Sequence, residues 1–197
     1  MEFHRIHYSR CKSKRYLLGM VGFTSIELVV TTAVLAVLTA LALPSFTTII
    51  DTWHVRQTVE NLQSTLYYAR SEAIRRGGKI VIQKVENNTN GCTTAEDKTD
   101  WDCGWFICED SNGNGKCAAT EPVLKIINSP QGVQVSRTGG ADTIKFNRWG
   151  LVDGAWLGFS LVPSGKSTTH PGARGLCMSA AGRTRIIPPE DIPCTSG

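Results

Sequence analysis

Two arginines near the C-terminal end of the chain have a spacing that suits phosphate binding. They lie in the segment Gly182-Arg183-Thr184-Arg185. Side chains at i and i+2 of an extended segment point to the same side, so both guanidinium groups can face one ligand. A guanidinium makes bidentate hydrogen bonds to phosphate oxygens, and glycine lets a phosphate approach the backbone closely. The segment predicts a phosphate-binding site, with a solvated turn as the alternative.

The distribution of charge is consistent with a polyanion as the ligand. Residues 86–121 carry eight acidic side chains and two lysines, a balance of −6, whereas residues 122–185 carry eight basic and two acidic side chains, a balance of +6. A polarised surface of this kind attracts polyanions, although a solvated face without a partner has the same composition. Three further cations of the basic half could extend a phosphate site: Arg148, Lys166 and Arg174.

A second group of oxygen-bearing side chains matches the spacing of a calcium loop. Oxygen ligands at positions 1, 3, 5 and 12 and glycine at position 6 occur in Asp110-x-Asn112-x-Asn114-Gly115-x₅-Glu121. An EF-hand needs a helix on each side of this loop, whereas the flanking residues have the pattern of strands. Two successive Asn-Gly pairs also favour a hairpin turn. The segment predicts an Asx-rich hairpin, with a calcium site as the alternative.

The remaining reactive side chains form no catalytic pattern. His54 and His170 are the histidines beyond the N-terminal apolar run, and neither is spaced with a serine and aspartate or a cysteine. The chain has no G-x-S-x-G, P-loop or zinc signature. We expect no enzyme, no bound metal and no cofactor.

Six of the seven cysteines lie beyond the apolar run, and Cys11 precedes it. An even number of cysteines in an oxidising compartment indicates disulfides. Six thiols allow fifteen pairings. Short loops favour pairing of neighbours, which gives Cys92–Cys103, Cys108–Cys117 and Cys177–Cys194.

An apolar run near the N-terminus has the length of a membrane span. Phe23 to Leu43 is 21 residues with a single carboxylate, Glu27, and about 20 apolar residues cross a bilayer core. A lone carboxylate in lipid is costly, which makes Glu27 a candidate functional residue. Five cations precede the run and predict that residues 1–22 stay in the cytoplasm: Arg5, Arg10, Lys12, Lys14 and Arg15.

Helical periodicity continues beyond this run. An apolar stripe spaced by three and four residues consists of Val55, Val59, Leu62, Leu66, Ala69 and Ala73. Gly77 and Gly78 are suited to end the helix. We expect one helix from about Phe23 to about Arg76, kinked at Pro44, whose second half packs on a sheet.

Beyond Gly78 the apolar segments have the length of strands, with turns rich in glycine, asparagine and proline. The expected strands are Lys79–Val85, Gly104–Cys108, Val123–Ile127, Val133–Ser136, Thr143–Phe146, Trp156–Val162, Leu176–Ser179 and Arg183–Ile187. The sequence predicts an α+β fold in which a long helix packs on an antiparallel β-sheet domain.

The N-terminal pattern resembles the signal of type IV pilins and of the pseudopilins of type II secretion. The resemblance rests on a basic leader ending in Gly22, an aromatic Phe23, Glu27 at the fifth position after it, and Pro44. It implies cleavage between Gly22 and Phe23 by a prepilin peptidase, methylation of Phe23, and insertion in the inner membrane with the domain in the periplasm. It also implies assembly with other pilins, in which Glu27 would pair with the Phe23 amine of a neighbouring subunit.

The rest of the chain resembles the GspH/FimT branch of this family, and its FimT-type minor pilins most. The resemblance rests on Tyr68–Gly77, on a Gly-Trp strand leading to Asp110–Gly115, and on Gly182–Arg185. It implies a pilin fold and DNA binding by Gly182, Arg183 and Arg185, in the uptake of DNA for natural transformation. Lys166 and Arg174 would extend that site. A structural minor pilin or a type II secretion pseudopilin is the alternative.

Four segments follow from this resemblance. Residues 1–22 are a cleaved leader, 23–44 the membrane and filament-core half of the helix, 45–77 its amphipathic half, and 78–197 a β-rich globular domain. DNA would be bound through backbone phosphates, with little sequence preference and strong dependence on salt. Trp149 and Trp156 could stack on bases of a single strand, but core packing explains them more simply.

Overall fold

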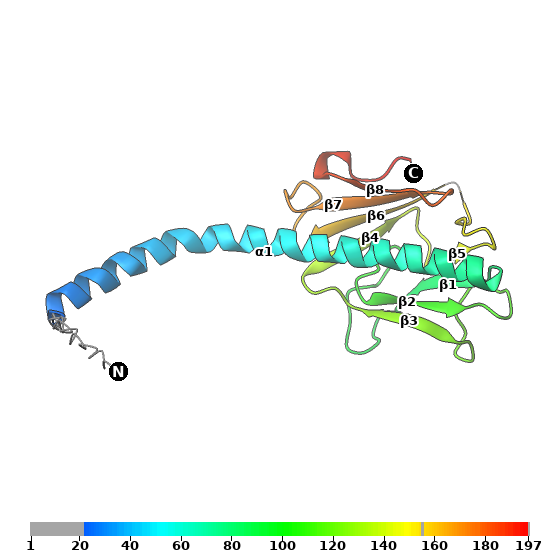
Figure 1. Cartoon of the computed structure of the whole chain (residues 1–197), viewed down its shortest axis with the longest axis horizontal. Helices are drawn as coiled ribbons and strands as arrows, with labels where there is room; N and C mark the ends of the chain where they lie inside the picture. The colour runs from blue at the N-terminus through cyan, green and yellow to red at the C-terminus, as the bar shows by residue number, and fades with distance from the viewer. Residues whose placement is uncertain (1–21, 155, 197) are drawn as a thin grey trace, which may run out of the picture. The chain divides into compact units, whose positions relative to one another are not determined.

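The computed structural model describes residues 22–154 and 156–196. One long helix, α1 (Ser25–Arg76), precedes eight strands (Figure 1). The strands are β1 (Ile80–Lys84), β2 (Gly104–Glu109), β3 (Val123–Asn128), β4 (Val133–Thr138), β5 (Thr143–Phe146), β6 (Trp156–Pro163), β7 (Arg174–Ser179) and β8 (Thr184–Ile187). A short 3-10 helix, η1 (Pro189–Asp191), follows them. The predicted α+β class and the antiparallel pairing of the strands are confirmed.

The chain divides into two compact units, residues 1–42 and 43–197. In the first unit, α1 begins with a capping arrangement in which the Thr24 hydroxyl accepts a hydrogen bond of 3.3 Å from the Glu27 amide. Apolar side chains are exposed along this part of the helix, with Phe23 76% and Leu41 74% exposed. Most of the predicted leader, residues 1–21, lies outside the described residues, and the kink at Pro44 stays a prediction.

The described residues contain no single helix with the length and hydropathy of a membrane span. The segments Ser25–Leu41 and Phe46–Arg76 meet both requirements only when they are taken together as a broken pair.

In the second unit, the apolar stripe of α1 is the centre of the core. Its six predicted members are all buried: Val55, Val59, Leu62, Leu66, Ala69 and Ala73. The helix ends where Gly77 adopts a φ of +74° and the Gly78 amide donates 2.7 Å to the Ala73 carbonyl. Glycine reaches positive φ at no steric cost, which is why the pair ends the helix here.

The strands form two antiparallel sheets, a number that the sequence left open. One has the order β3-β2-β1-β5 and the other β4-β6-β7-β8 (Figure 1). Residues of both sheets pack in one core with the helix stripe, among them Ile82 and Ile144 from the first sheet and Leu161 and Leu176 from the second. Neighbouring strands twist by roughly 20–25°, so eight strands in one sheet would turn away from a single helix, whereas two sheets both reach it.

Three disulfides join neighbouring cysteines. They are Cys92–Cys103, Cys108–Cys117 and Cys177–Cys194, the pairing that short loops favour. The first closes the acidic segment before β2, the second ties β2 to the loop that follows it, and the third ties β7 to the C-terminal segment.

An ion-pair cluster ties the end of α1 to β2. Glu72 is buried and accepts hydrogen bonds from Arg75 (2.5 and 3.1 Å) and from Arg76 (2.7 Å). Arg76 also pairs with Glu109 of β2. The hydrogen bonds from Arg75 and then Arg76 lower the pKa of Glu72 from its ordinary value of 4.5, against the opposing effect of burial.

We expect this cluster to make stability fall in acid. A carboxyl whose pKa is lowered on folding stabilises the protein above its unfolded pKa, and the contribution is lost as pH falls through the folded pKa. Glu72→Gln should lower the free energy of unfolding at pH 7 by about 1–3 kcal/mol, and should flatten the pH dependence below the ordinary value of 4.5. Melting temperatures of the full chain against pH measure both effects.

Glu60→Gln is the control, since Glu60 is exposed on the same helix. An equal acid-dependent loss in Glu72→Gln and in the unmutated chain would contradict the assignment of this effect to Glu72.

Candidate nucleic-acid site

The predicted phosphate-binding arginines lie on the hairpin between β7 and β8. Within its turn, the Gly182 amide donates 2.8 Å to the Ser179 carbonyl, and the Ser179 amide donates 2.9 Å to the Arg183 carbonyl. Gly182 is buried and has a φ of +85°, a conformation that favours glycine. The turn therefore places Arg183 at the start of an edge strand.

Contacts with α1 determine which way this edge strand faces. The Thr184 hydroxyl lies 2.5 Å from the Tyr67 hydroxyl and accepts 2.8 Å from the Gln63 side-chain amide. Successive residues of a strand alternate between faces, so Arg183 and Arg185 belong to the face turned away from the helix. Both are exposed. Within residues 22–154 and 156–196, neither side chain has an ion-pair partner.

A third arginine, which the sequence did not single out as a ligand, lies against the same turn. A Cβ atom added to Gly182 would stand 1.9 Å from Nη1 of Arg70, a residue of α1. A Cβ added to Gly150 would stand 2.7 Å from Cγ of the same arginine. Arg70 is separated from Gly182 by more than a hundred residues, so only the fold brings the two together. The available signal was its position within the Tyr68–Gly77 run.

The structure does not bring Lys166 and Arg174 to this hairpin. Trp156 pairs with Ser179, and Leu161 pairs with Arg174, so Arg174 lies at the other end of β7. Five residues of strand separate the two ends by roughly 17 Å. The Arg174 guanidinium donates to the carbonyls of its own loop, at 2.8 and 2.6 Å, and Lys166 lies in the connection before β7. The predicted set therefore forms two groups.

Arg148 lies on a turn next to Arg70. This turn includes Gly150, whose neighbour Trp149 is 66% exposed and carries the Arg148 guanidinium 5.2 Å from its ring centre. The expectation that Trp149 packs in the core is therefore wrong, because a tight four-residue turn projects it into solvent. Trp156 is partly buried against the cluster around Cys177 and Cys194, so packing does account for it.

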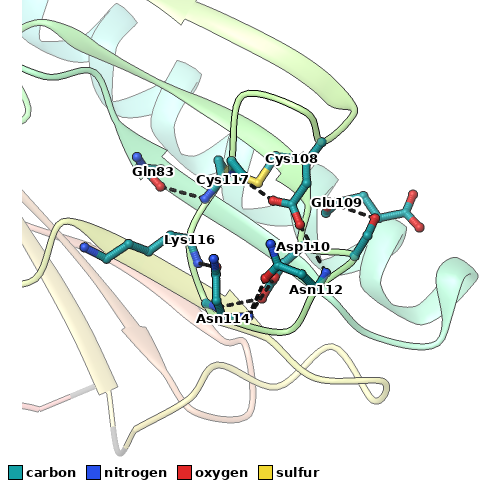
Figure 2. Close-up of a disulfide and its surroundings, with 12 residues drawn as sticks. Gln83, Cys108, Glu109, Asp110, Asn112, Asn114, Lys116 and Cys117 are labelled. Atoms are coloured by element: carbon teal, nitrogen blue, oxygen red, sulfur yellow. Dashed lines mark hydrogen bonds between the residues drawn. A yellow bond between two sulfur atoms is a disulfide. The ribbon is translucent and has the colours of Figure 1, made fainter.

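The segment Asp110–Glu121, which has the spacing of a calcium loop, is a closed loop. Its side-chain oxygens accept hydrogen bonds from backbone amides of the same loop (Figure 2). Asp110 is buried, and its two carboxylate oxygens accept from the amides of Asn114 (3.0 Å) and Gly115 (2.8 Å). Glu121 accepts from the amides of Asn112 (3.2 Å) and Ala118 (2.8 Å). These bonds correspond to the Asx-rich turn that the sequence predicted.

The surroundings of this loop differ from those of an EF-hand. Strands β2 and β3 flank it, and the Cys108–Cys117 disulfide closes it. The backbone amides of Ala118, Asn112 and Ser111 lower the pKa of Glu121, which keeps it ionised as an acceptor. Within the described parts of the chain, no group of three or more histidine, cysteine or acidic side chains is arranged to hold a metal ion.

We expect Asp110→Ala to destabilise the chain by about 1–3 kcal/mol, because it leaves the buried Gly115 amide without an acceptor. Asp110→Asn retains one acceptor oxygen and should cost less. Replacing calcium by a chelator should leave the melting temperature of the unmutated chain unchanged. A clear rise in melting temperature with calcium would instead support the calcium alternative.

The predicted processing and assembly residues lie at the start of the first unit. Gly22 and Phe23 precede α1, and Glu27 lies in its first turn. The side chain of Glu27 is exposed. A carboxylate in the first turn interacts favourably with the positive end of the helix dipole, which contributes to its position here.

A long N-terminal helix whose second half packs on antiparallel sheets defines a pilin-fold protein. Two crystal structures of the type IV minor pilin FimU from Pseudomonas aeruginosa share this fold. They have TM-scores of 0.51 and 0.52, 24% identity, and cover 70% and 71% of this chain and 96% and 92% of their own. The minor pseudopilin EpsH from the type 2 secretion system of Vibrio cholerae aligns at 13% identity and a TM-score of 0.47, over 69% of this chain and 98% of its own.

The family model of the type II transport protein GspH matches residues 58–182. The chain therefore belongs to the GspH family. A comparison with curated protein sequences finds no match. The predicted pilin fold is confirmed, and the predicted family is confirmed at the level of GspH.

Proposed function

We propose that this chain is a minor type IV pilin that binds DNA without sequence preference during DNA uptake in natural transformation. One observation carries the proposal: Arg183 and Arg185 are exposed on one face of an edge strand and, within the described residues, have no ion-pair partner. A guanidinium that no carboxylate neutralises is free to bind a phosphate in the bidentate manner.

The hairpin holds these arginines firmly enough to serve as a site. Thr184, which stands between them, is hydrogen-bonded to Gln63 and Tyr67 of α1. Cys177 pairs with Arg185 across the strands and is itself tied to Cys194. Because the strand is fixed on both sides, the two long side chains are the parts that remain to be ordered when a phosphate binds.

Because the proposed contacts are to phosphates, we expect the affinity for DNA to fall as the salt concentration rises. Each phosphate that is neutralised releases counterions, so the logarithm of affinity falls with the logarithm of salt concentration by about 0.9 per contact. Phosphate contacts read no bases. The site should therefore bind duplexes of different sequence with similar affinity.

The matching experiment measures fluorescence anisotropy of a labelled random duplex with the full chain in detergent. Arg183→Gln/Arg185→Gln should weaken binding at least tenfold at low salt and reduce the salt slope by roughly one to two. Lys98→Gln/Lys116→Gln is the control, since it removes the same charge from the acidic segment. The assignment fails if the unmutated chain does not bind at low salt, or if the arginine variant binds as well as the control.

Processing and membrane insertion would bring this domain to its site of action. We infer that a prepilin peptidase cleaves between Gly22 and Phe23, that Phe23 is methylated, and that residues 23–44 anchor the chain in the inner membrane before it enters a filament with other pilins. The domain would then lie in the periplasm and later at the cell surface. It would act as a binding and assembly component and not as an enzyme.

A second candidate function is purely structural, as a minor pilin or a type II secretion pseudopilin that primes or caps a filament. It is favoured by the row of exposed apolar side chains on the described part of the first unit, from Ile26 (73%) to Leu41 (74%). Exposed apolar surface of this extent marks an interaction with a membrane or another protein. DNA binding by the unmutated chain separates the two candidates.

Assembly can be tested at Glu27. Glu27→Ala should still insert and be cleaved but should be absent from sheared filaments, because a subunit without this carboxylate has no partner for the Phe23 amine of its neighbour. Glu27→Asp retains the charge and should enter filaments at least in part. Filament entry by Glu27→Ala at the level of the unmutated chain would contradict the pairing.

A further inference from the structure

We propose that Arg70 of α1 is a third phosphate ligand of this DNA site, and that Gly150 and Gly182 leave the space in which its side chain lies. This inference rests on the proposed function and extends it to a residue on a different element. It concerns how the hairpin and the helix form one binding surface for the backbone of a nucleic acid.

The side chain of Arg70 fits between two glycine turns. Its stem lies against Gly150, where an added Cβ would be 2.7 Å from Cγ, and its head lies against Gly182, where an added Cβ would be 1.9, 2.5 and 3.1 Å from Nη1, Cζ and Nε. Contacts under 3 Å are too short for carbon and nitrogen atoms. Any side chain at either position therefore displaces Arg70.

Within the described residues, the guanidinium of Arg70, a half-buried residue, has no ion-pair partner. The acidic side chain nearest in sequence, Glu72, is occupied by Arg75 and Arg76. Among the described residues, the buried side-chain nitrogen without a partner is Nε of Arg137 and none belongs to Arg70, so the five N–H donors of Arg70 are accessible to water or to a ligand anion. A phosphate oxygen is the acceptor that a guanidinium fits best.

Arginine side chains lie on both sides of the hairpin turn. Thr184 faces α1, so Arg70 lies on the helix side of the turn, whereas Arg183 and Arg185 lie on the other side. Gly182 separates them and carries no side chain. A phosphate backbone that crosses the turn at Gly182 therefore meets guanidinium groups on both sides. Arg148 lies on the turn that contains Gly150, the other glycine beside Arg70.

These contacts give Gly182 a role beyond its backbone conformation. Its φ of +85° would be compatible with asparagine, which adopts positive φ more readily than other side chains. Asparagine has a Cβ, however, and would displace the Arg70 guanidinium. Gly182→Asn therefore tests the space for Arg70 with the least change to the turn.

The experiment measures duplex affinity and its salt dependence for the full chain in detergent. Arg70→Gln should weaken binding about five- to tenfold at low salt and reduce the salt slope by about one, the value for one phosphate contact. Arg70→Lys should keep most of the salt slope and lose part of the affinity, because it keeps the charge without the planar fork. Melting temperatures show that each variant is folded.

Arg56→Gln is the matched control. Arg56 is an exposed arginine of the same helix, 14 residues earlier and hence roughly 21 Å away along the axis. It should bind duplex DNA like the unmutated chain. An equal loss in Arg56→Gln and Arg70→Gln would mean that net charge alone matters, and would overturn the inference.

Gly182→Asn should weaken binding about as much as Arg70→Gln, and the two changes together should weaken it no further, because they remove one contact. Fully additive losses would overturn the role given to Gly182. If Arg70→Gln binds like the unmutated chain while Arg183→Gln/Arg185→Gln does not, Arg70 is not a ligand and the proposed function stands. If the unmutated chain fails to bind, the proposed function fails first.

Discussion

The packing of one helix stripe against two sheets is the constraint on which the rest of the domain depends. All six apolar residues of the stripe, from Val55 to Ala73, are buried. Both sheets pack their apolar faces against them. Burying a large aliphatic side chain stabilises a fold by about 1.5–3 kcal/mol. These side chains therefore contribute to the stability of the domain, and both sheets are positioned against them.

The candidate site is a consequence of that packing at the edge of the second sheet. Strand β8 has one neighbouring strand, β7, and the face of β8 that carries Thr184 meets α1. The helix therefore takes part in orienting Arg183 and Arg185, and it contributes Arg70 to the same hairpin. A site made from an edge strand and a helix face is wide enough to follow a nucleic-acid backbone, whereas an enclosed cavity would exclude it.

Charge in the sequence and charge on the surface are different quantities here. Three of the eight acidic side chains of residues 86–121 are buried: Asp102, Asp110 and Glu121. The carboxylate oxygens of Asp110 and Glu121 accept hydrogen bonds from backbone amides. Glu109 forms an ion pair with Arg76 of α1. Part of the acidic balance therefore maintains structure, whereas Arg183 and Arg185 remain exposed. The charge contrast between residues 86–121 and residues 122–185 is therefore better explained by the structural role of the acidic side chains than by two opposed binding faces.

Most elements of this fold follow from local patterns of residues. Local periodicity and glycine turns depend on neighbouring residues, so the bounds of the helix and of the eight strands could be predicted to within a few residues. Short cysteine spacings in the same way favoured pairing of neighbouring cysteines. Contacts across long separations came only from the packing of the whole domain: the division of the strands into two sheets, Lys166 and Arg174 apart from the hairpin, Trp149 in solvent, and Arg70 beside Gly182. Those contacts depend on twist, register and the packing of distant segments, which no local pattern of residues contains.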